Sequence, residues 1–430
     1  MWLGAGRENS RVTGRPDAPA VILSHGPGGL GAARTLARRG VKVIAIAFED
    51  SDPVLHSRHP KEAIRVRGVD PSEREGNVLQ ILRDLPYEGA AILPTSDRLV
   101  AFLSNHRAEL SRKYRFRLPD PDTVDAINDK SREIALVSRL GVAVPRTIEE
   151  LPSAPEALER MLRYPIIMKP HSFAAMKLFP ERLVVVSNAK ELSAFYDKWG
   201  HALAAILAQE VIPGPMTNSW VCSCTYDENH ELLDCLVRQK IRTMPANFGT
   251  STFSICQDNP QIVALARSLG KKLGYVGHAG IEYRWDDRDG EFKYIEMNPR
   301  IGGEVGFDEA CGLPTVWNTY RIALGLEATA SGNQQDNGRY FVNLPRDLVS
   351  LRKLGTSIPR VAAIHLSLLT KPTSGQYFAW DDPSPGLVVA YRFLIEMGQL
   401  LRRRLAGSGE RDPKQLVAAG VSRSSKGGAV

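Results

Sequence analysis

The sequence predicts a parallel α/β domain followed by a larger α+β region. Near the N-terminus, the apolar run AVILSH is followed by the glycine turn GPGGLG, a helix-like segment and a second apolar run, VKVIAIAF. This order is typical of a strand–helix–strand unit in a parallel sheet. After residue 165, short runs with alternating apolar residues are separated by turns, which favours antiparallel strands. A chain of 430 residues is long enough for two to four such units.

The composition is that of an ordered globular protein, with 43% hydrophobic and 24% charged residues and no apolar run of membrane-spanning length. The net charge of +7 leaves phosphates, nucleic acid and acidic surfaces open as partners. Basic motifs with interleaved aromatic residues are absent, so we do not expect a nucleic-acid partner. None of the five cysteines has zinc-site spacing, and the C-x-C at Cys222 and Cys224 lies in an apolar run. We expect core packing in a reduced, cytoplasmic setting.

The elements follow in order. The first unit continues with a strand, a turn and a helix in AAILPTSDRLVAFLSNHRAEL, and we expect it to close near residue 120. Helical spacing returns in DTVDAINDKSREIALVSRL, followed by short strands in PIIMKP, RLVVVSN, QEVIPG and SWVCSCTYD. The segment PQIVALARSLGKKL predicts a helix, and GHAGIEYRW and FKYIEMNPR predict two strands joined by a turn. A further amphipathic helix is expected in GLVVAYRFLIEMGQLLRRRL.

Oxygen-bearing side chains gather on this pair of strands. Glu296 and Asn298 alternate along the second strand and therefore share a face, and Glu282 lies near the end of the first. Two carboxylates and an amide oxygen suit Mg²⁺. Arg300 follows on the same side. A structural salt-bridge network is the alternative interpretation of the same residues.

Cationic residues occur at the ends of other elements. Lys169 ends a buried strand, Lys130 begins a helical segment, and Lys240 and Arg242 lie in RQKIRTMP. Each lysine taken alone is commonly a solvated surface charge. Together with the acidic cluster, these separated cations fit a binding site for a triphosphate and its metal ion.

In this order, the motifs NDKSREIALVSRLGVAVPRT, PIIMKP, QEVIPG, KIRTMPANFGTST and YIEMNPRIGGE resemble the ATP-grasp carboxylate-amine ligase superfamily, especially its D-aspartate-ligase-like and biotin-carboxylase-like branch. The resemblance covers roughly residues 20–330 and implies an ATP-grasp fold. The units that it implies are a disordered extension (1–18), a pre-ATP-grasp α/β domain (19–122), a small lid subdomain (123–208), a large antiparallel-sheet subdomain (209–330), a C-terminal extension (331–406) and a disordered tail (407–430).

The resemblance also assigns roles to individual residues. It places the ATP phosphates on Lys130 and Lys169, and Glu210, Val211 and Ile212 on the hinge strand that meets the adenine. It makes Glu282, Glu296 and Asn298 the ligands of Mg²⁺, with Mn²⁺ as a substitute. Lys240, Arg242 and Arg300 face the transferred phosphoryl group or the substrate carboxylate, and Glu304 occupies the position of a base. The segment HSFAAMKLFPERL lacks the glycines of the usual phosphate-closing loop. Our hypothesis is that Lys177 contributes positive charge there instead.

The activity that the resemblance implies is amide-bond formation: a carboxylate attacks the γ-phosphorus of ATP, and an amine displaces phosphate from the acylphosphate. Small carboxylate and amine substrates, most simply amino acids, and a possible homodimer follow as expectations. Three alternatives remain: a carboxylase-type grasp enzyme, an NAD(P)-dependent oxidoreductase that uses GPGGLG, and a non-catalytic grasp fold.

Overall fold

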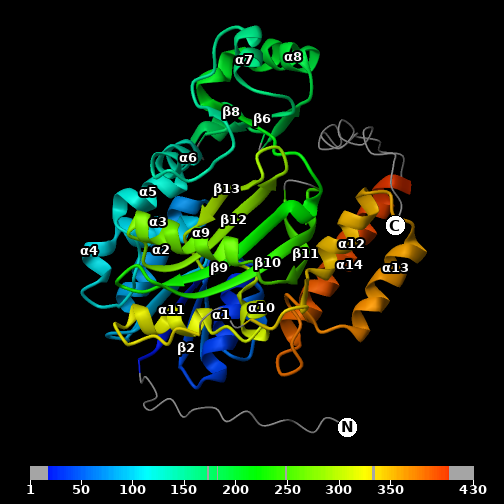
Figure 1. Ribbon diagram of the computed structural model, residues 1–430. Helices are drawn as coiled ribbons and strands as arrows, with labels where there is room; N and C mark the ends of the chain where they lie inside the picture. The colour runs from blue at the N-terminus through cyan, green and yellow to red at the C-terminus, as the bar shows by residue number, and fades with distance from the viewer. Residues whose placement is uncertain (1–17, 172–173, 182, 247–248, 332–334, 406–430) are drawn as a thin grey trace.

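The computed structural model describes residues 18–171, 174–181, 183–246, 249–331 and 335–405. The expected N-terminal extension lies outside them except for residue 18, and the expected C-terminal tail lies outside them altogether. Three sheets organise the chain (Figure 1). In the described residues, no helix is both long and apolar enough to cross a membrane.

The first sheet is parallel, as the sequence predicts, with strand order β3–β2–β1–β4. Its strands are β1 (Ala20–Ser24), β2 (Val43–Ala47), β3 (Glu62–Arg65) and β4 (Ala91–Pro94). The helices of this domain are α1 (Pro27–Arg38), α2 (Pro71–Asp84), α3 (Asp97–Asn105) and α4 (Arg107–Leu110). Strands β1 and β2 are buried along their whole length because helices cover both faces of the sheet.

The second sheet is small and antiparallel, in the order β5–β8–β6–β7. Its strands are β5 (Thr147–Ile148), β6 (Ile166–Pro170), β7 (Val184–Val186) and β8 (Ile206–Glu210), and its helices are α7 (Pro155–Met161) and α8 (Ala189–Trp199). Figure 1 shows this unit standing at the top of the molecule, away from the other two sheets.

The third sheet has seven strands in the order β13–β12–β9–β10–β11–β14–β15. They are β9 (Ser219–Tyr226), β10 (Leu232–Met244), β11 (Thr250–Cys256), β12 (Gly277–Asp286), β13 (Glu291–Asn298), β14 (Tyr340–Val342) and β15 (Thr373–Gly375). The associated helices are α9 (Pro260–Leu273), α10 (Val305–Ala310) and α11 (Thr315–Ala323). The predicted helix at residues 260–273 and the predicted pairing of β12 with β13 are both confirmed.

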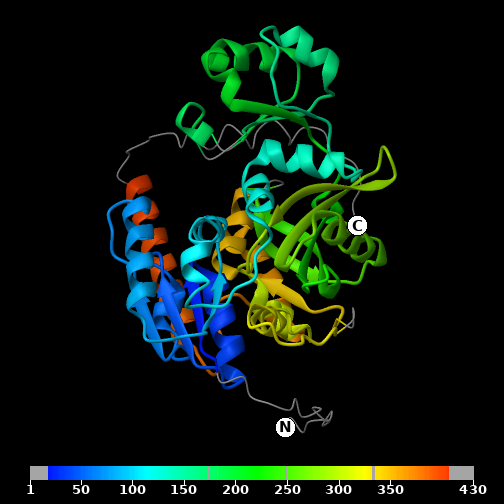
Figure 2. The same cartoon turned by 90° about the vertical axis from the view of Figure 1, so that its left-hand side faces the viewer.

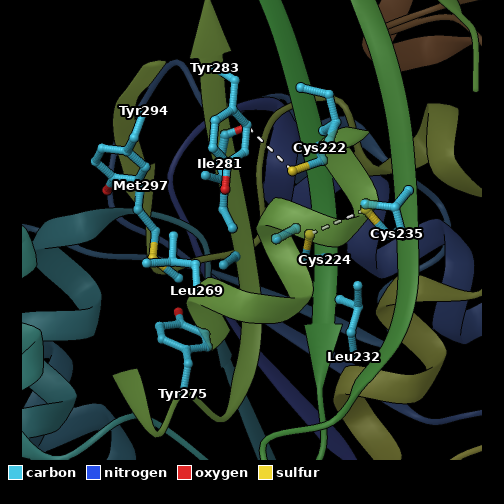
Figure 3. Close-up of a cluster of buried hydrophobic side chains, with 14 of the residues drawn as sticks. Cys222, Cys224, Leu232, Cys235, Leu269, Tyr275, Ile281, Tyr283, Tyr294 and Met297 are labelled. Carbon is cyan, nitrogen blue, oxygen red and sulfur yellow. Dashed lines mark hydrogen bonds between the residues drawn. The ribbon is translucent and has the colours of Figure 1, made fainter. Parts of the chain in front are cut away.

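One face of the large sheet is apolar and carries three of the cysteines. Cys222 and Cys224 on β9 and Cys235 on β10 are fully buried, and their sulfur atoms lie within 4.8 Å of one another (Figure 3). Leu269 of α9 and aromatic side chains of β12 and β13 belong to the same cluster. All five cysteines are free and buried, so the expected core packing is confirmed.

Several expected boundaries need correction. The helical stretch after residue 122 is two helices, α5 (Pro121–Asn128) and α6 (Lys130–Arg139), because Asp129 caps the second one. Both belong with the large sheet rather than the lid, since Ile127, Ile134 and Val137 pack into the large-sheet core. The small sheet continues to Glu210, whose register partner is Ile166, and the expected boundary after residue 208 therefore cuts through β8.

The region after residue 330 is more closely integrated than a separate extension. Its strands β14 and β15 continue the large sheet beyond β11. Its helices are α12 (Leu344–Lys353), α13 (Ile358–Ser367) and α14 (Ser384–Leu405). Helix α14 contacts residues 53–56 of the first domain (Figure 2). The short strands have too few residues to show a period in the sequence.

The glycines in the first turn of α1 allow close packing against neighbouring segments. A Cβ on Gly28 would lie 3.0 Å from the carbonyl oxygen of Gly302, and a Cβ on Gly29 would lie 1.8 Å from the Ser24 hydroxyl oxygen. Carbonyl oxygens of the loop after β13 therefore lie against the start of α1. In a dinucleotide-binding domain, the phosphates of the nucleotide would occupy this place. These contacts argue against the oxidoreductase alternative.

We expect Gly29→Ala to lower the free energy of unfolding by about 1–3 kcal/mol, because the added methyl group has no space beside Ser24. Gly76→Ala is the matched control: Gly76 is an exposed residue inside α2 with open space around it, so the change should add about 0.5–1 kcal/mol. Denaturant unfolding of both variants measures the difference. Equal stability of Gly29→Ala and the unsubstituted chain would contradict this packing.

Candidate active site

The polar face of the large sheet gathers the charged residues that the sequence singled out. Alternation along β10 places Lys240 on the face opposite the cysteine cluster, and β12 contributes Glu282 to the same face. Glu282 lies opposite Glu296 in the register of β12 and β13, and Gly280 lies opposite Asn298. The prediction that the two strands bring these acidic residues together is therefore confirmed.

Each of the two glutamates faces a lysine. Lys240 Nζ lies 2.6 Å from Glu282 Oε2, and Lys130 Nζ lies 3.3 Å from Glu296 Oε2. The Lys240 side chain is only 6% exposed, whereas Glu296 is 35% exposed toward solvent. The nearby Lys130 is the main cause that lowers the pKa of Glu296 to about 2, whereas burial acts in the opposite direction. Burial raises the pKa of Glu282, and Lys240 opposes that shift.

Lys130 occupies the first turn of α6. The Asp129 carboxylate accepts hydrogen bonds from the backbone amides of Ser131 and Arg132, which fixes the start of the helix. The Lys130 backbone amide donates to the carbonyl oxygen of His171, directly beyond β6. Helix α6 thus carries Lys130 between the small sheet and the large one.

Lys169 reaches the same region from β6. Its ammonium group donates to Gln209 Oε1 on β8 over 3.1 Å. Burial first and the nearby Lys130 second lower the pKa of Lys169 to about 8, against the opposing effects of Glu296 and Glu133. No carboxylate of the described residues lies within salt-bridge distance of this ammonium group.

Asn298 and Arg300 connect the cluster to the first domain. Arg300 donates through Nη2 to Asn298 Oδ1 over 3.2 Å, and its Nε lies 3.2 Å from Asp97 Oδ1. Asp97 is the first residue of α3, directly after the parallel strand β4. Arg300 therefore lies where the parallel domain meets the large sheet.

Glu304 lies beside the cluster but has a cationic partner of its own. The buried Arg238, two residues before Lys240 on β10, forms an ion pair with Glu304 and lies 3.7 Å from Asp308 Oδ1. Glu304 is therefore already engaged in an ion pair with a buried guanidinium group. A role of Glu304 as a base stays a prediction.

Arg242 is directed away from the cluster. β-Bulges on both sides of Arg242 shift the register with β11 and interrupt the alternation along β10. Its guanidinium binds Asp347 of α12 through two hydrogen bonds of 2.8 and 2.7 Å and lies over the Phe253 ring. Arg242 thus attaches α12 to the sheet, and its expected role beside Lys240 needs correction.

The residues expected to meet the adenine lie at the end of β8 and directly after it, and their backbone groups already form hydrogen bonds within the protein. Glu210 accepts from the backbone amide of Arg163, and its second carboxylate oxygen lies 3.5 Å from Arg288. The Val211 amide donates to the carbonyl oxygen of Pro165, and the Ile212 carbonyl accepts from Arg284. These contacts join β8 to the hairpin of β12 and β13, so the strand bridges the two antiparallel sheets.

Lys177 is not brought to the cluster. It is exposed at the end of a short 3₁₀ turn (Ala174–Lys177), and it forms no ion pair with a described residue. Residues 172–173 and 182 of the glycine-poor loop lie outside the described residues. A role for Lys177 therefore stays a prediction.

Sequence reasoning missed four charged or polar partners: Glu133, Arg238, Asp97 and Gln209. Glu133 and Arg238 carried a weak signal, because each lies two or three residues from a lysine that was singled out. Asp97 carried no such signal, because it contacts Arg300 across more than 200 residues of sequence. Gln209 carried none either, because its sequence position is that of any polar residue in a strand.

Comparisons with known proteins agree with this geometry. Residues 251–330, which include Glu282, Glu296 and Asn298, match the family model of the carbamoyl-phosphate synthase L chain, ATP binding domain. The chain has the ATP-grasp fold. A D-aspartate ligase of Enterococcus faecium is 22% identical in an alignment of 279 residues that covers 60% of this chain and 65% of that ligase. The matched region thus spans slightly less than two thirds of this relative.

Solved ATP-grasp structures resemble the chain over most of its length. The biotin carboxylase domain of the Hydrogenobacter thermophilus 2-oxoglutarate carboxylase, in complex with MgADP, superposes with a TM-score of 0.59 at 18% identity and covers 75% of this chain and 73% of its own. An L-amino acid ligase of Bacillus licheniformis gives 0.54 at 19% identity, covering 72% and 75%. At this identity, the likeness establishes the fold alone.

We call the region where these charged side chains of α6, β6, β10, β12 and β13 come together the cleft. Glu282, Glu296 and Asn298 supply the hard oxygen atoms that Mg²⁺ prefers, and Lys130, Lys169 and Lys240 supply cations for phosphates. Both signs of charge occur side by side, and the cationic side chains come from α6, β6 and β10. The cleft therefore has the chemistry to bind a metal–polyphosphate complex.

We expect Lys169→Met to stabilise the folded chain by about 1–3 kcal/mol at pH 7, because burial holds the pKa of Lys169 near 8, below its ordinary value. A lowered lysine pKa means that the charged form destabilises the fold. This cost is fully present below pH 8 and disappears as the pH rises through the unfolded-state pKa. Thermal unfolding between pH 7 and 10.5 should show the advantage of the variant shrinking. A constant difference would contradict the assignment.

Proposed function

We propose that the chain is an ADP-forming carbon–nitrogen ligase that activates a carboxylate with ATP and joins it to an amine. The observation that carries the proposal is the arrangement on one face of the large sheet, where Glu282 and Glu296 lie opposite each other and each faces a lysine. The similarity to a D-aspartate ligase and an L-amino acid ligase supports this reaction class.

In this proposal, Glu282, Glu296 and Asn298 hold Mg²⁺, with Mn²⁺ as a substitute. The bound metal ion neutralises the phosphate charge of ATP. Lys130 and Lys169 bind phosphate oxygens, and Lys240 faces the transferred phosphoryl group. The lysines work by position and charge, since phosphoryl transfer needs mainly alignment and electrostatic stabilisation from the protein. The small unit built on strands β5, β6, β7 and β8 serves as the lid over the nucleotide.

The chemistry proceeds in two steps. A substrate carboxylate oxygen attacks the γ-phosphorus of ATP, and the bond between that phosphorus and the bridging oxygen of ADP breaks to give an acylphosphate. The amine nitrogen then attacks the acyl carbon, loses a proton and displaces inorganic phosphate. Arg300 binds the substrate carboxylate, because it lies at the meeting point of the first domain and the large sheet.

Amino acids are the substrates we propose, because the relatives include a D-aspartate ligase and an L-amino acid ligase. A homodimer is proposed by analogy with the Hydrogenobacter carboxylase domain, which is described as a dimer. A carboxylase-type grasp enzyme is the second candidate, supported by the likeness to biotin carboxylase domains.

Phosphate release from ATP, measured across a matrix of amino acid pairs with Mg²⁺, tests the proposal. We expect release that depends on one carboxylate and one amine, with a new amide detected by mass spectrometry. Release that depends instead on bicarbonate would favour the carboxylase-type candidate. Absence of ATP binding would overturn both.

We expect Glu296→Gln to abolish ATP turnover and leave the fold intact, because the amide keeps the size of the side chain but removes the charge that faces Lys130 and the metal ion. The matched control is Glu291→Gln, on the same strand but exposed and paired only with Lys293. Turnover is measured by ADP release and folding by thermal unfolding. Full activity of the Glu296 variant would contradict the metal assignment.

A further inference from the structure

Lys130 has two carboxylate partners. Its ammonium nitrogen lies 3.0 Å from Glu133 Oε2 and 3.3 Å from Glu296 Oε2. Lys240, the other lysine that faces a proposed metal ligand, has a single ion-pair partner among the described residues, Glu282. The two lysine–glutamate pairs of the cleft are therefore not equivalent.

The two partners of Lys130 differ in their surroundings. The Glu133 side chain is fully buried, and its Oε1 accepts hydrogen bonds from the Tyr294 hydroxyl group at 2.6 Å and the Met297 backbone amide at 2.7 Å. The Glu296 side chain is about a third exposed. Glu133 is thus fixed within the protein, whereas Glu296 opens onto the cleft.

This difference matters when a nucleotide binds. For Glu296 to coordinate a metal ion, its contact with Lys130 has to break. The Lys130 side chain is 34% exposed, and a partly buried ammonium group left without a partner is costly. Glu133 continues to balance the positive charge of Lys130 during that exchange. Its own position stays fixed, because both of its carboxylate oxygens accept hydrogen bonds within the protein.

We propose that Glu133 is a positioning residue that anchors Lys130 while Lys130 exchanges Glu296 for a phosphate oxygen of the nucleotide. The inference rests on the proposed function, since it requires a metal–nucleotide complex in the cleft. The same carboxylate also fixes the backbone amide of Met297, which lies between Glu296 and Asn298 on β13. Glu133 thereby sets the phosphate-binding lysine and both strand-borne metal ligands relative to one another.

Glu133→Gln tests this role. The amide keeps an acceptor for Tyr294 and Met297 but loses the charge that compensates Lys130. We expect the dissociation constant of MgADP, measured by calorimetry, to rise about tenfold or more, as for a lost hydrogen bond to a charged group. The matched control is Glu309→Gln, a largely buried acid paired with Arg39 directly after α1, which should leave nucleotide affinity unchanged.

A double-mutant cycle separates positioning from general structural damage. If Glu133 acts through Lys130, then Glu133→Gln should have little further effect on MgADP affinity in a Lys130→Gln background. Equal losses of affinity in both backgrounds, or unchanged affinity with a lowered melting temperature, would overturn the inference. Where Glu133→Gln does not fold, Glu133→Asp is used in the same cycle, because it keeps the charge and shortens the reach.

These outcomes are distinguishable from failure of the proposed function. Nucleotide affinity is measured without an acid or amine substrate, so a chain that binds MgADP but joins no substrates loses only the proposed ligase reaction. Absence of MgADP binding by the unsubstituted chain would overturn both proposals.

Discussion

The cleft of this ATP-grasp protein depends on the pairing of opposite charges in a poorly solvated space. Uncompensated ammonium or carboxylate groups are costly to bury. Two lysines meet this constraint: Lys240 of the large sheet pairs with Glu282, and Lys130 of α6 pairs with Glu296. The opposite face of the same sheet is apolar and packs against α9. Period-two alternation along the strands therefore separates the chemistry from the core.

The site also exists only where three parts of the chain meet. Lys169 comes from the small sheet, Glu282 from the large sheet, and Arg300 contacts Asp97 at the end of the parallel domain. Lys130 lies on α6, the helix between the two antiparallel sheets, and its backbone amide bonds to the segment after β6. A displacement of the small sheet thus changes the distance between Lys169 and the other charges without breaking either glutamate–lysine pair.

The sequence indicated the elements and the core of the site because both depend on local patterns. Alternation predicts that Glu296 and Asn298 share a face, and the turn between two apolar runs predicts the pairing that brings Glu282 opposite Glu296. The roles of Arg242 and Glu304 could not be obtained in this way. Their partners, Asp347 and Arg238, lie far away in sequence, and a β-bulge that the composition does not reveal turns Arg242 aside. Strands as short as β14 carry no period at all.

The three lysines of the cleft differ in how many carboxylates balance their charge, and this difference affects how each can bind phosphate. Among the described residues, Lys130 has two carboxylate partners, Lys240 has one, and Lys169 has the side-chain amide of Gln209 but no carboxylate. A phosphate that approaches Lys169 displaces no anion, so its charge is gained there without a competing loss. Burial first and the nearby Lys130 second lower the pKa of Lys169 to about 8, and the more distant Glu296 and Glu133 offset this only in part. The least stable cation of the cleft is therefore the one best prepared to bind an anion.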